Sequence, residues 1–300
     1  MSDTQAGALR IYTEKMMKIY RISFKSQGEL YMYLKGEPEV NRDVFPKQSS
    51  ISTDVSFAGL AYEWAVEYLL GGYNGEYDIV LGMQRDLERY VPVRSNEYTT
   101  ERSFAGSHPD VPAYIAGNPR SMYRRKRTAE KKFCRVWLNL ACPVKTTRGA
   151  ILNRGALTLS LVKLLESQGL SVDLRVFMSV YEYDEVFLFE ISLKSPQEQL
   201  NSKKCFYPLC SREFVRRLII RVMESMPFGE KSWFPNYGMS LSSLQFREIF
   251  SIPQTDLVIS TPEEMGIYGY NIYYDGASMF SAMGIDKNIV IKLREAGVTA

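Results

Sequence analysis

The densest concentration of chemically distinctive side chains is a run of arginines and lysines near the middle of the chain. Residues 120–135, RSMYRRKRTAEKKFCR, hold eight basic side chains against a single acidic one, Glu130. Clustered cations bind polyanions because they neutralise phosphates and release condensed counterions, an effect that needs no fixed geometry. An aromatic ring in the same run can stack on an unpaired base. We therefore expect a nucleic-acid site formed by Arg120, Tyr123, Arg124, Arg125, Lys126, Arg127, Lys131 and Lys132.

Two further features favour such a site, and each also has a simpler explanation. A helix predicted over residues 212–226 has a basic face opposite its apolar one. That face consists of Arg212, Arg216, Arg217 and Arg221. The segment 267–276, IYGYNIYYDG, offers four tyrosines as a stacking platform. The simpler explanations are a solvated helix surface, tyrosines packed on a sheet edge and, for residues 120–135, a solvated loop without a partner.

The residues that most often perform enzymatic chemistry are scarce or unsuitably spaced. Histidine is the most common acid–base catalyst and metal ligand, and the chain has one, His108, in the turn-like sequence SHPD. The four cysteines lack the spacing and companion histidines of a zinc site, and we interpret them as reduced thiols. Neither a GxxxxGK[ST] nor a GxGxxG phosphate-binding sequence occurs, and the acidic stretch 181–185 is typical of a hairpin turn. We therefore expect a non-enzymatic protein with no cofactor and no metal.

Composition and charge set the broad class of the chain. Its 300 residues are 45% hydrophobic and 24% charged, which is typical of a globular protein. The formal net charge of +3 does not indicate a nucleic-acid partner by itself, because binding depends on the local distribution of charge. No run approaches the roughly 20 apolar residues of a membrane span, and the first residues lack the apolar core of a signal peptide. We expect a cytoplasmic protein with no membrane partner.

Hydrophobic periodicity predicts the elements that must position these residues. Helices are predicted over residues 56–70, 77–90, 148–168, 212–226 and 286–297. Strands are predicted over residues 133–142, 170–181, 185–193 and 255–260. In the first helix Leu60, Trp64 and Tyr68 share a face, and Gly169 stands where a left-handed C-cap would end the third. Residues 93–122, rich in proline and glycine, are predicted to form a long ordered loop.

The order of these elements predicts the fold class and the division of the chain. Strands alternating with helices are typical of a three-layer α/β domain, in which crossover helices cover a mostly parallel sheet. We assign this domain to residues 106–300. Residues 1–105 are predicted to form an N-terminal mixed or helical lobe.

Several stretches resemble a protein family found in bacteriophages and prophages, to which no activity is assigned. The stretches are 110–122 (DVPAYIAGNPRSM), 136–144 (VWLNLACPV), 153–176, the TDLVIS strand and the REAGV terminus. The core also resembles the von Willebrand factor A fold, whose first strand ends in an Asp-x-Ser-x-Ser metal loop. The aligned residues here are Asn139, Ala141 and Pro143, which lack the carboxylate and hydroxyls that Mg²⁺ requires.

The resemblance implies a phage context, and the basic cluster indicates the binding chemistry. The leading hypothesis is a non-enzymatic phage protein of the host cytoplasm that binds nucleic acid, single-stranded DNA above all. It would support viral transcription or replication, for example by recruiting a phage or host RNA polymerase. One alternative is a protein–protein adaptor, or an inhibitor of host defence, that acts through the degenerate A-domain face at residues 142–148. Another is an enzyme whose carboxylates the sequence does not identify.

Overall fold

The computed structural model describes most of the chain. The described residues are 7–72, 78–90, 98–127, 132–143, 145–229, 232, 234, 237–265, 281, 285, 288–289, 292 and 298–299. For Arg125, Lys126 and Arg127 the description covers the backbone. The tyrosine segment 267–276, most of the helix predicted over 286–297, and Lys131 lie outside the described residues.

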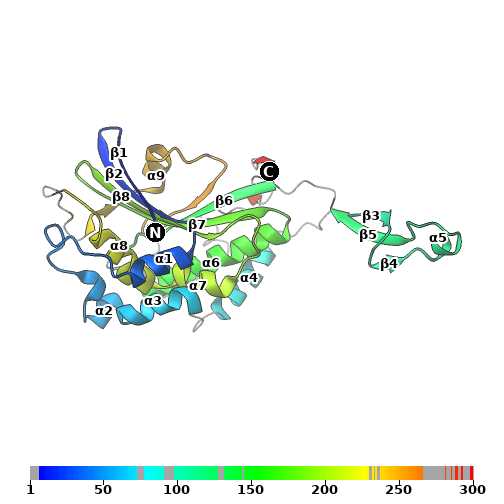
Figure 1. Cartoon of the computed structure of the whole chain (residues 1–300), viewed down its shortest axis with the longest axis horizontal. Helices are drawn as coiled ribbons and strands as arrows, with labels where there is room; N and C mark the ends of the chain where they lie inside the picture. The colour runs from blue at the N-terminus through cyan, green and yellow to red at the C-terminus, as the bar shows by residue number, and fades with distance from the viewer. Residues whose placement is uncertain are drawn as a thin grey trace, which may run out of the picture.

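A mixed sheet forms the centre of the main body (Figure 1). Its strands run in the order β1-β2-β8-β7-β6-β10, and the short strands β11 and β9 pair with β6 and β7. The β2–β8, β7–β6 and β6–β10 pairs are parallel, whereas β1–β2 and β7–β8 are antiparallel, so this path is mostly parallel. The strands are β1 (Ala8–Glu14), β2 (Met17–Phe24), β6 (Lys132–Asn139), β7 (Ser171–Glu182), β8 (Glu185–Lys194), β9 (Met239–Ser240), β10 (Leu257–Ile259) and β11 (Val298–Thr299).

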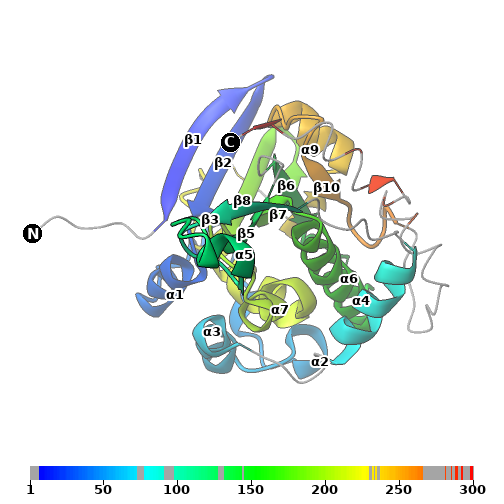
Figure 2. The same cartoon turned by 90° about the vertical axis from the view of Figure 1, so that its right-hand side faces the viewer.

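Helices flank this sheet on both faces (Figures 1 and 2). Most of them share one large hydrophobic core with one face of the sheet, whereas α9 covers the other face. There, Phe246 of α9 stacks on Phe177 of β7 with ring centroids 3.7 Å apart. The helices of the main body are α1 (Gln27–Lys35), α2 (Val55–Ala58), α3 (Tyr62–Gly71), α4 (Asp78–Tyr90), α6 (Arg148–Ser167), α7 (Ser202–Cys210), α8 (Ile220–Glu224) and α9 (Ser243–Ile249), with a short 3-10 turn (Ser49–Ile51) and a π-helical segment (Phe214–Ile219). Among the described residues, no helix combines the length and apolar composition needed to cross a membrane.

The helix α6 shows how local sequence sets an element. The Thr147 hydroxyl accepts a hydrogen bond from the Ala150 N–H at 3.3 Å and caps the N-terminus. At the other end Gly169 has φ of +91°, as predicted for a left-handed residue that ends a helix. The helix connects β6 to β7, which are parallel neighbours. The predicted strand–helix–strand unit over 133–181 is therefore confirmed, as are the antiparallel β7–β8 pair and the late strand β10.

The separate N-terminal lobe predicted for residues 1–105 is not confirmed. Strands β1 and β2 belong to the main sheet, and β2 pairs in parallel with β8 from Lys18 to Phe24. Apolar side chains of α1, α3 and α4 belong to the same core as those of β6, α6 and β7. The division of the chain at residues 105 and 106 stays a prediction. Periodicity indicates which face of an element is buried, but not which distant element covers it.

The helix predicted over residues 56–70 differs from the structure in its continuity and its buried face. Gly59, with φ of +74°, separates α2 from α3. The ring of Trp64 is 62% exposed, whereas Ala65, Val66 and Leu69 are buried. The spacing predicts that the face with Leu60, Trp64 and Tyr68 is the buried one. In the structure the adjacent face, with Ala65, Val66 and Leu69, is the one buried in the core.

Candidate nucleic-acid interface

Residues 98–127 form a small three-stranded sheet that stands apart from the main body in Figure 1, and we call these residues the arm. Its central strand pairs antiparallel with a neighbour on each side. The elements are β3 (Tyr98–Ser103), β4 (His108–Pro109), α5 (Val111–Ile115) and β5 (Met122–Arg127). The prediction of a long loop is therefore wrong for residues 98–122, while residues 93–97 lie outside the described residues. The strands β3 and β4 are short, and they are defined by their pairing partners rather than by an alternation of apolar and polar residues.

The basic sequence is the central strand of the arm. Arg124 lies opposite Glu101 in the register with β3, and Arg127 lies opposite Tyr98. On its other side β5 pairs with β4 through Met122 and Tyr123. The four basic residues 124–127 therefore lie beyond the part of β5 that β4 covers.

A close approach of two backbones holds the turn between β3 and β4 against β5. A Cβ atom on Gly106 would lie 2.1 Å from the carbonyl oxygen of Tyr123, so only glycine fits this position. The next residue, Ser107, donates its N–H to the same carbonyl oxygen at 3.0 Å. The Asp110 N–H donates to the Ser121 carbonyl oxygen at 2.7 Å, at the other end of the β4–β5 pairing.

Asp110 is the polar centre of the arm. Its side chain is 4% exposed; it accepts a hydrogen bond from the Ala113 N–H at 3.1 Å, which caps α5, and one from Arg102 Nε at 2.7 Å. A hydrogen bond from Tyr123, the Ala113 N–H and the nearby Arg102 guanidinium hold the pKa of this carboxyl below its usual value of 3.8. The carboxylate thus ties β3, α5 and β5 together and neutralises Arg102.

The positive charge of the protein is concentrated in the arm. Its 30 residues contain six arginines and lysines and two acidic residues, a net charge of +4, while the whole chain carries +3. The rest of the chain therefore sums to −1. One of the arm's two carboxylates, Asp110, is paired with Arg102, and the other belongs to Glu101, opposite Arg124. The remaining cations of the arm, Arg120 and residues 125–127, exceed the acids available within it.

The structure brings most of the predicted site residues together and separates one from them. Arg120 and Arg124 are exposed, and Tyr123 is half-buried between β3 and β4. The backbones of Arg125, Lys126 and Arg127 continue β5. Lys132, in contrast, is half-buried at the start of β6 and pairs with Thr299 of β11 in the main sheet.

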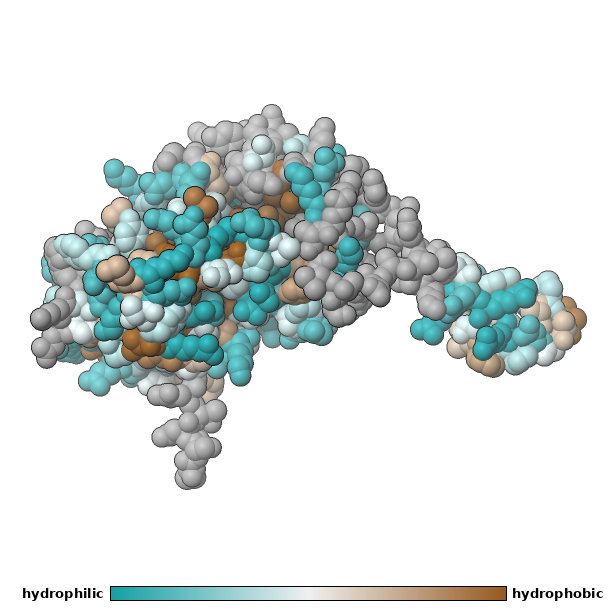
Figure 3. Space-filling model, turned by 90° about the horizontal axis from the view of Figure 1, so that it is seen from above, coloured by the Kyte–Doolittle hydropathy of each residue, from teal (hydrophilic) through white to brown (hydrophobic). Residues whose placement is uncertain are grey.

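Sequence reasoning missed an apolar surface at the end of the arm. Phe104, Val111, Tyr114 and Ile115 are all largely exposed. Figure 3 shows hydrophobic residues at the outer end of the arm and hydrophilic ones nearer the main body. The signal was available, because residues 111, 114 and 115 are spaced so that they share one face of a helical turn.

Two arginines of the predicted basic face over residues 212–226, Arg216 and Arg217, are internal, and the other two, Arg212 and Arg221, are half-buried, which corrects the interpretation of this face as a binding or solvated surface. Arg216 and Arg217 are 5% and 3% exposed. Arg217 donates to the carbonyl oxygens of Leu60 at 2.6 Å, Ser50 at 2.9 Å and Ser52 at 2.8 Å. Burial lowers the pKa of both guanidinium groups. These arginines anchor the segment 50–60 to the π-helical segment and are not available to a polyanion.

The loop at the carboxyl end of β6 is held by internal polar contacts. Asn139 Oδ1 accepts a hydrogen bond from the Ala141 N–H at 3.0 Å, and its amide donates to the Leu241 carbonyl oxygen at 3.3 Å. Arg154, 1% exposed, donates to the carbonyl oxygens of Asn139 at 2.7 Å and Ser260 at 3.1 Å, and burial lowers its pKa to about 10. Within the described ranges, no group of three histidine, cysteine, aspartate or glutamate side chains could hold a metal ion.

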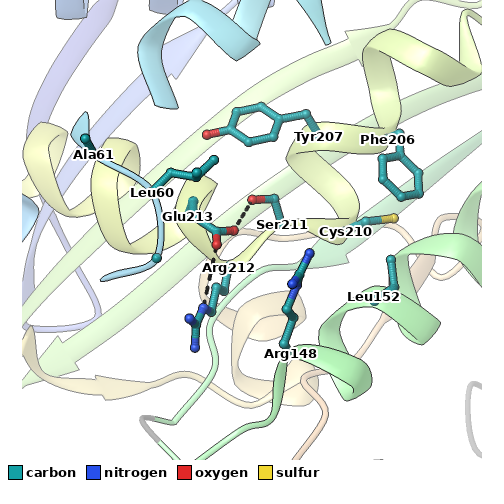
Figure 4. Close-up of a pocket in the computed structure, with 11 residues that line it drawn as sticks. Leu60, Ala61, Arg148, Leu152, Phe206, Tyr207, Cys210, Ser211, Arg212 and Glu213 are labelled. Atoms are coloured by element: carbon teal, nitrogen blue, oxygen red, sulfur yellow. Dashed lines mark hydrogen bonds and ion pairs between the residues drawn. The ribbon is translucent and has the colours of Figure 1, made fainter. Parts of the chain in front are cut away.

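A cavity of about 410 Å³ lies between α6 and α7 (Figure 4). Arg148 lines it from the start of α6, and Ser211, Arg212 and Glu213 line it from the segment after α7. The Glu213 carboxylate accepts a hydrogen bond from the Ser211 hydroxyl and lies 3.7 Å from Arg212 Nε. It is the only carboxylate among the described lining residues, so this cavity offers no pair of acids for acid–base chemistry.

Comparison with models of protein families gives a match that covers most of the chain. A family model, Domain of unknown function (DUF7192), matches residues 6–287. The matched region runs through the main sheet from β1 onward and includes the whole arm. No curated protein and no solved structure matches the chain.

Proposed function

The chain belongs to the DUF7192 family, and we propose that it is a non-enzymatic protein that binds nucleic acid, single-stranded DNA in particular, through the arm. The observation that carries this proposal is the concentration of a net charge of +4 in the 30 residues of a projecting sheet. A narrow basic ribbon can follow a phosphate backbone, since phosphate contact requires charge density rather than an exact fit.

The geometry of the arm supports this proposal over that of a solvated basic loop. The basic residues 124–127 lie on a hydrogen-bonded strand, β5, that has a defined register with β3. Among the three arginines of the arm whose side chains the structure describes, Arg102 is paired with a buried carboxylate, whereas Arg120 and Arg124 are exposed. Cations fixed on a strand and left without enough internal acids retain most of their attraction for an external polyanion.

The finer parts of the proposal rest on the sequence resemblance. We propose a bacteriophage protein with a von Willebrand factor A-like core that supports viral transcription or replication in the host cytoplasm. The resemblance at residues 110–122 and 153–176 supports the phage context. The parallel unit β6–α6–β7 supports the A-like core.

The test is a binding titration of the full chain against single-stranded DNA, double-stranded DNA and RNA over a series of salt concentrations. The variant Arg124→Glu/Arg125→Glu/Arg127→Glu should lose measurable binding to single-stranded DNA at low salt. The variant Arg124→Gln/Arg125→Gln/Arg127→Gln should bind weakly. Its plot of log K against log salt should be shallower by about 2, because each phosphate contact on a single strand contributes about 0.7 to the slope.

The matched control reverses three exposed charges on the main body. The variant Lys25→Glu/Arg42→Glu/Lys203→Glu changes the net charge by the same amount and should keep most of the affinity, since these residues lie outside the arm. The variant Arg124→Lys/Arg125→Lys/Arg127→Lys preserves the charge of the arm and should bind like the natural chain. If the arm and main-body reversals weaken binding equally, or neither does, the arm is not the interface.

A further inference from the structure

The end of the arm exposes large apolar side chains that a domain of this kind normally buries. The exposed fractions are 68% for Phe104, 55% for Val111, 72% for Tyr114 and 79% for Ile115. In α5 the residue turned inward is Ala113, which is 7% exposed. The short helix thus buries its smallest side chain and presents its largest ones to solvent. Single exposed apolar residues are ordinary, but several large ones within one small sheet are typical of a contact surface.

This apolar surface at the end of the arm lies next to the start of the basic strand β5. The guanidinium of Arg120 lies over the ring of Phe104, with Cζ 5.4 Å from the ring centroid. Arg120 leads into β5, where the remaining cations follow within seven residues. An aromatic ring beside a row of cations is the arrangement with which proteins bind single strands, the cations contacting phosphates and the rings stacking on bases.

We infer that Phe104 and Tyr114 form a base-stacking platform for unpaired nucleotides, flanked by the apolar surfaces of Val111 and Ile115. This inference rests on the proposed function and names the side chains that would distinguish single-stranded from double-stranded nucleic acid. In a duplex the faces of a base are covered by its neighbours, whereas in a single strand a face is open to an aromatic side chain. The charge of the arm favours a phosphate-bearing ligand over an apolar protein surface, because clustered cations have no partner on such a surface.

The test separates base contacts from phosphate contacts. The full chain is titrated with an oligothymidylate and with an abasic oligonucleotide of the same length, which has the same phosphates but no bases. The natural chain should prefer the oligothymidylate. The variant Phe104→Leu/Tyr114→Leu keeps the apolar surface but removes both rings, and it should lose roughly five- to 150-fold of affinity for the oligothymidylate per stacked base. Its affinity for the abasic strand and its salt dependence should be unchanged.

Two control variants address the fold and the need for a ring. The variant Phe104→Tyr/Tyr114→Phe keeps both rings and should bind like the natural chain. The variant Trp64→Leu/Tyr183→Leu removes the rings of two residues of the main body that are 62% and 74% exposed, and it should leave the affinity for both oligonucleotides unchanged.

The outcomes distinguish this inference from the function on which it rests. If the Phe104→Leu/Tyr114→Leu variant binds both strands like the natural chain, while the Arg-to-Glu arm variant binds neither, the arm binds nucleic acid but the platform is refuted. If the Arg-to-Glu variant also binds normally, the proposed function fails as well. Sedimentation with vesicles of anionic lipid gives a third outcome. Lipid binding that depends on Phe104 and Tyr114, without a preference for bases, would make the end of the arm a membrane contact and would overturn the inference.

Discussion

The same substitution at two helical glycines should change the stability of the protein in opposite directions. Gly155 lies in α6 and Gly82 in α4. A Cβ atom at Gly155 would lie 2.2 Å from the Leu209 carbonyl oxygen and 2.6 Å from Cys210 Sγ, both of α7. At Gly82 a Cβ atom would meet nothing within 4 Å.

The magnitudes follow from two opposing effects. Replacing glycine with alanine in a helix stabilises it by about 0.8–1 kcal/mol, because the unfolded chain loses conformational freedom. At Gly155 the new methyl group would overlap a backbone oxygen, so α7 must move away from α6 as a unit. Overpacking of this kind costs about 1–3 kcal/mol, and a backbone contact places the cost at the upper end. We expect Gly155→Ala to destabilise the protein by about 2 kcal/mol and Gly82→Ala to stabilise it by up to about 1 kcal/mol.

Urea unfolding followed by far-ultraviolet circular dichroism measures both effects. The Gly155→Ala variant should unfold at a lower urea concentration and the Gly82→Ala variant at a slightly higher one, with similar slopes. In a thermal scan each kcal/mol corresponds to about 1.6 °C for a chain of 300 residues, because the entropy of unfolding is about 2.1 cal/mol/K per residue. A Gly155→Ala variant as stable as the natural chain would show that α6 and α7 do not meet backbone to backbone.

Two further predictions follow from ionisable groups. Interactions with Tyr123, Ala113 and Arg102 lower the pKa of Asp110, so its contribution to the arm is present above the unfolded pKa of about 4 and is lost as the pH falls through the lowered value. The Ala113 N–H should therefore lose its protection from hydrogen exchange in acid before the N–H groups of the main sheet do. The variant Asp110→Asn should abolish this acid-dependent loss of protection. Protection of the Ala113 N–H that persists to about pH 2 would contradict the role given to Asp110. Burial raises the pKa of the Cys134 and Cys205 thiols to about 12. Both thiols should therefore resist a thiol reagent near pH 8 until urea unfolds the chain. Prompt labelling of either cysteine in the native protein would show that the reagent reaches it without unfolding.

The elements that could be predicted from the sequence are those whose signals are local. The helix α6 has an apolar stripe, a capping threonine at 147 and a left-handed glycine at 169. Strands β7 and β8 are mainly apolar segments separated by a tight turn at residues 183–184. Each of these signals lies within one continuous stretch of sequence, so the element can be predicted without knowing its distant contacts.

The basic cluster was also identified from sequence, but its structural context was not. Charge density over residues 120–127 is a property of the chain itself. That these residues form the central strand of a projecting sheet depends on pairing with β3 and β4, which are short and have no strong alternation. The apolar end of the arm was missed for a related reason. Three residues of a single helical turn are too few to show whether an apolar face is buried or exposed.

Composition and local pattern thus determined by themselves that the chain is an α/β protein with an arginine-rich segment near the middle of its sequence. Tertiary structure decided which arginines are available to a ligand. Arg217 is internal because carbonyl oxygens from segments 157 to 167 residues earlier converge on it, whereas Arg124 remains exposed on the arm. Both residues have basic neighbours in sequence, so local pattern cannot separate them. A guanidinium can be buried only where enough acceptors surround it, and those acceptors come from distant parts of the chain that folding brings together.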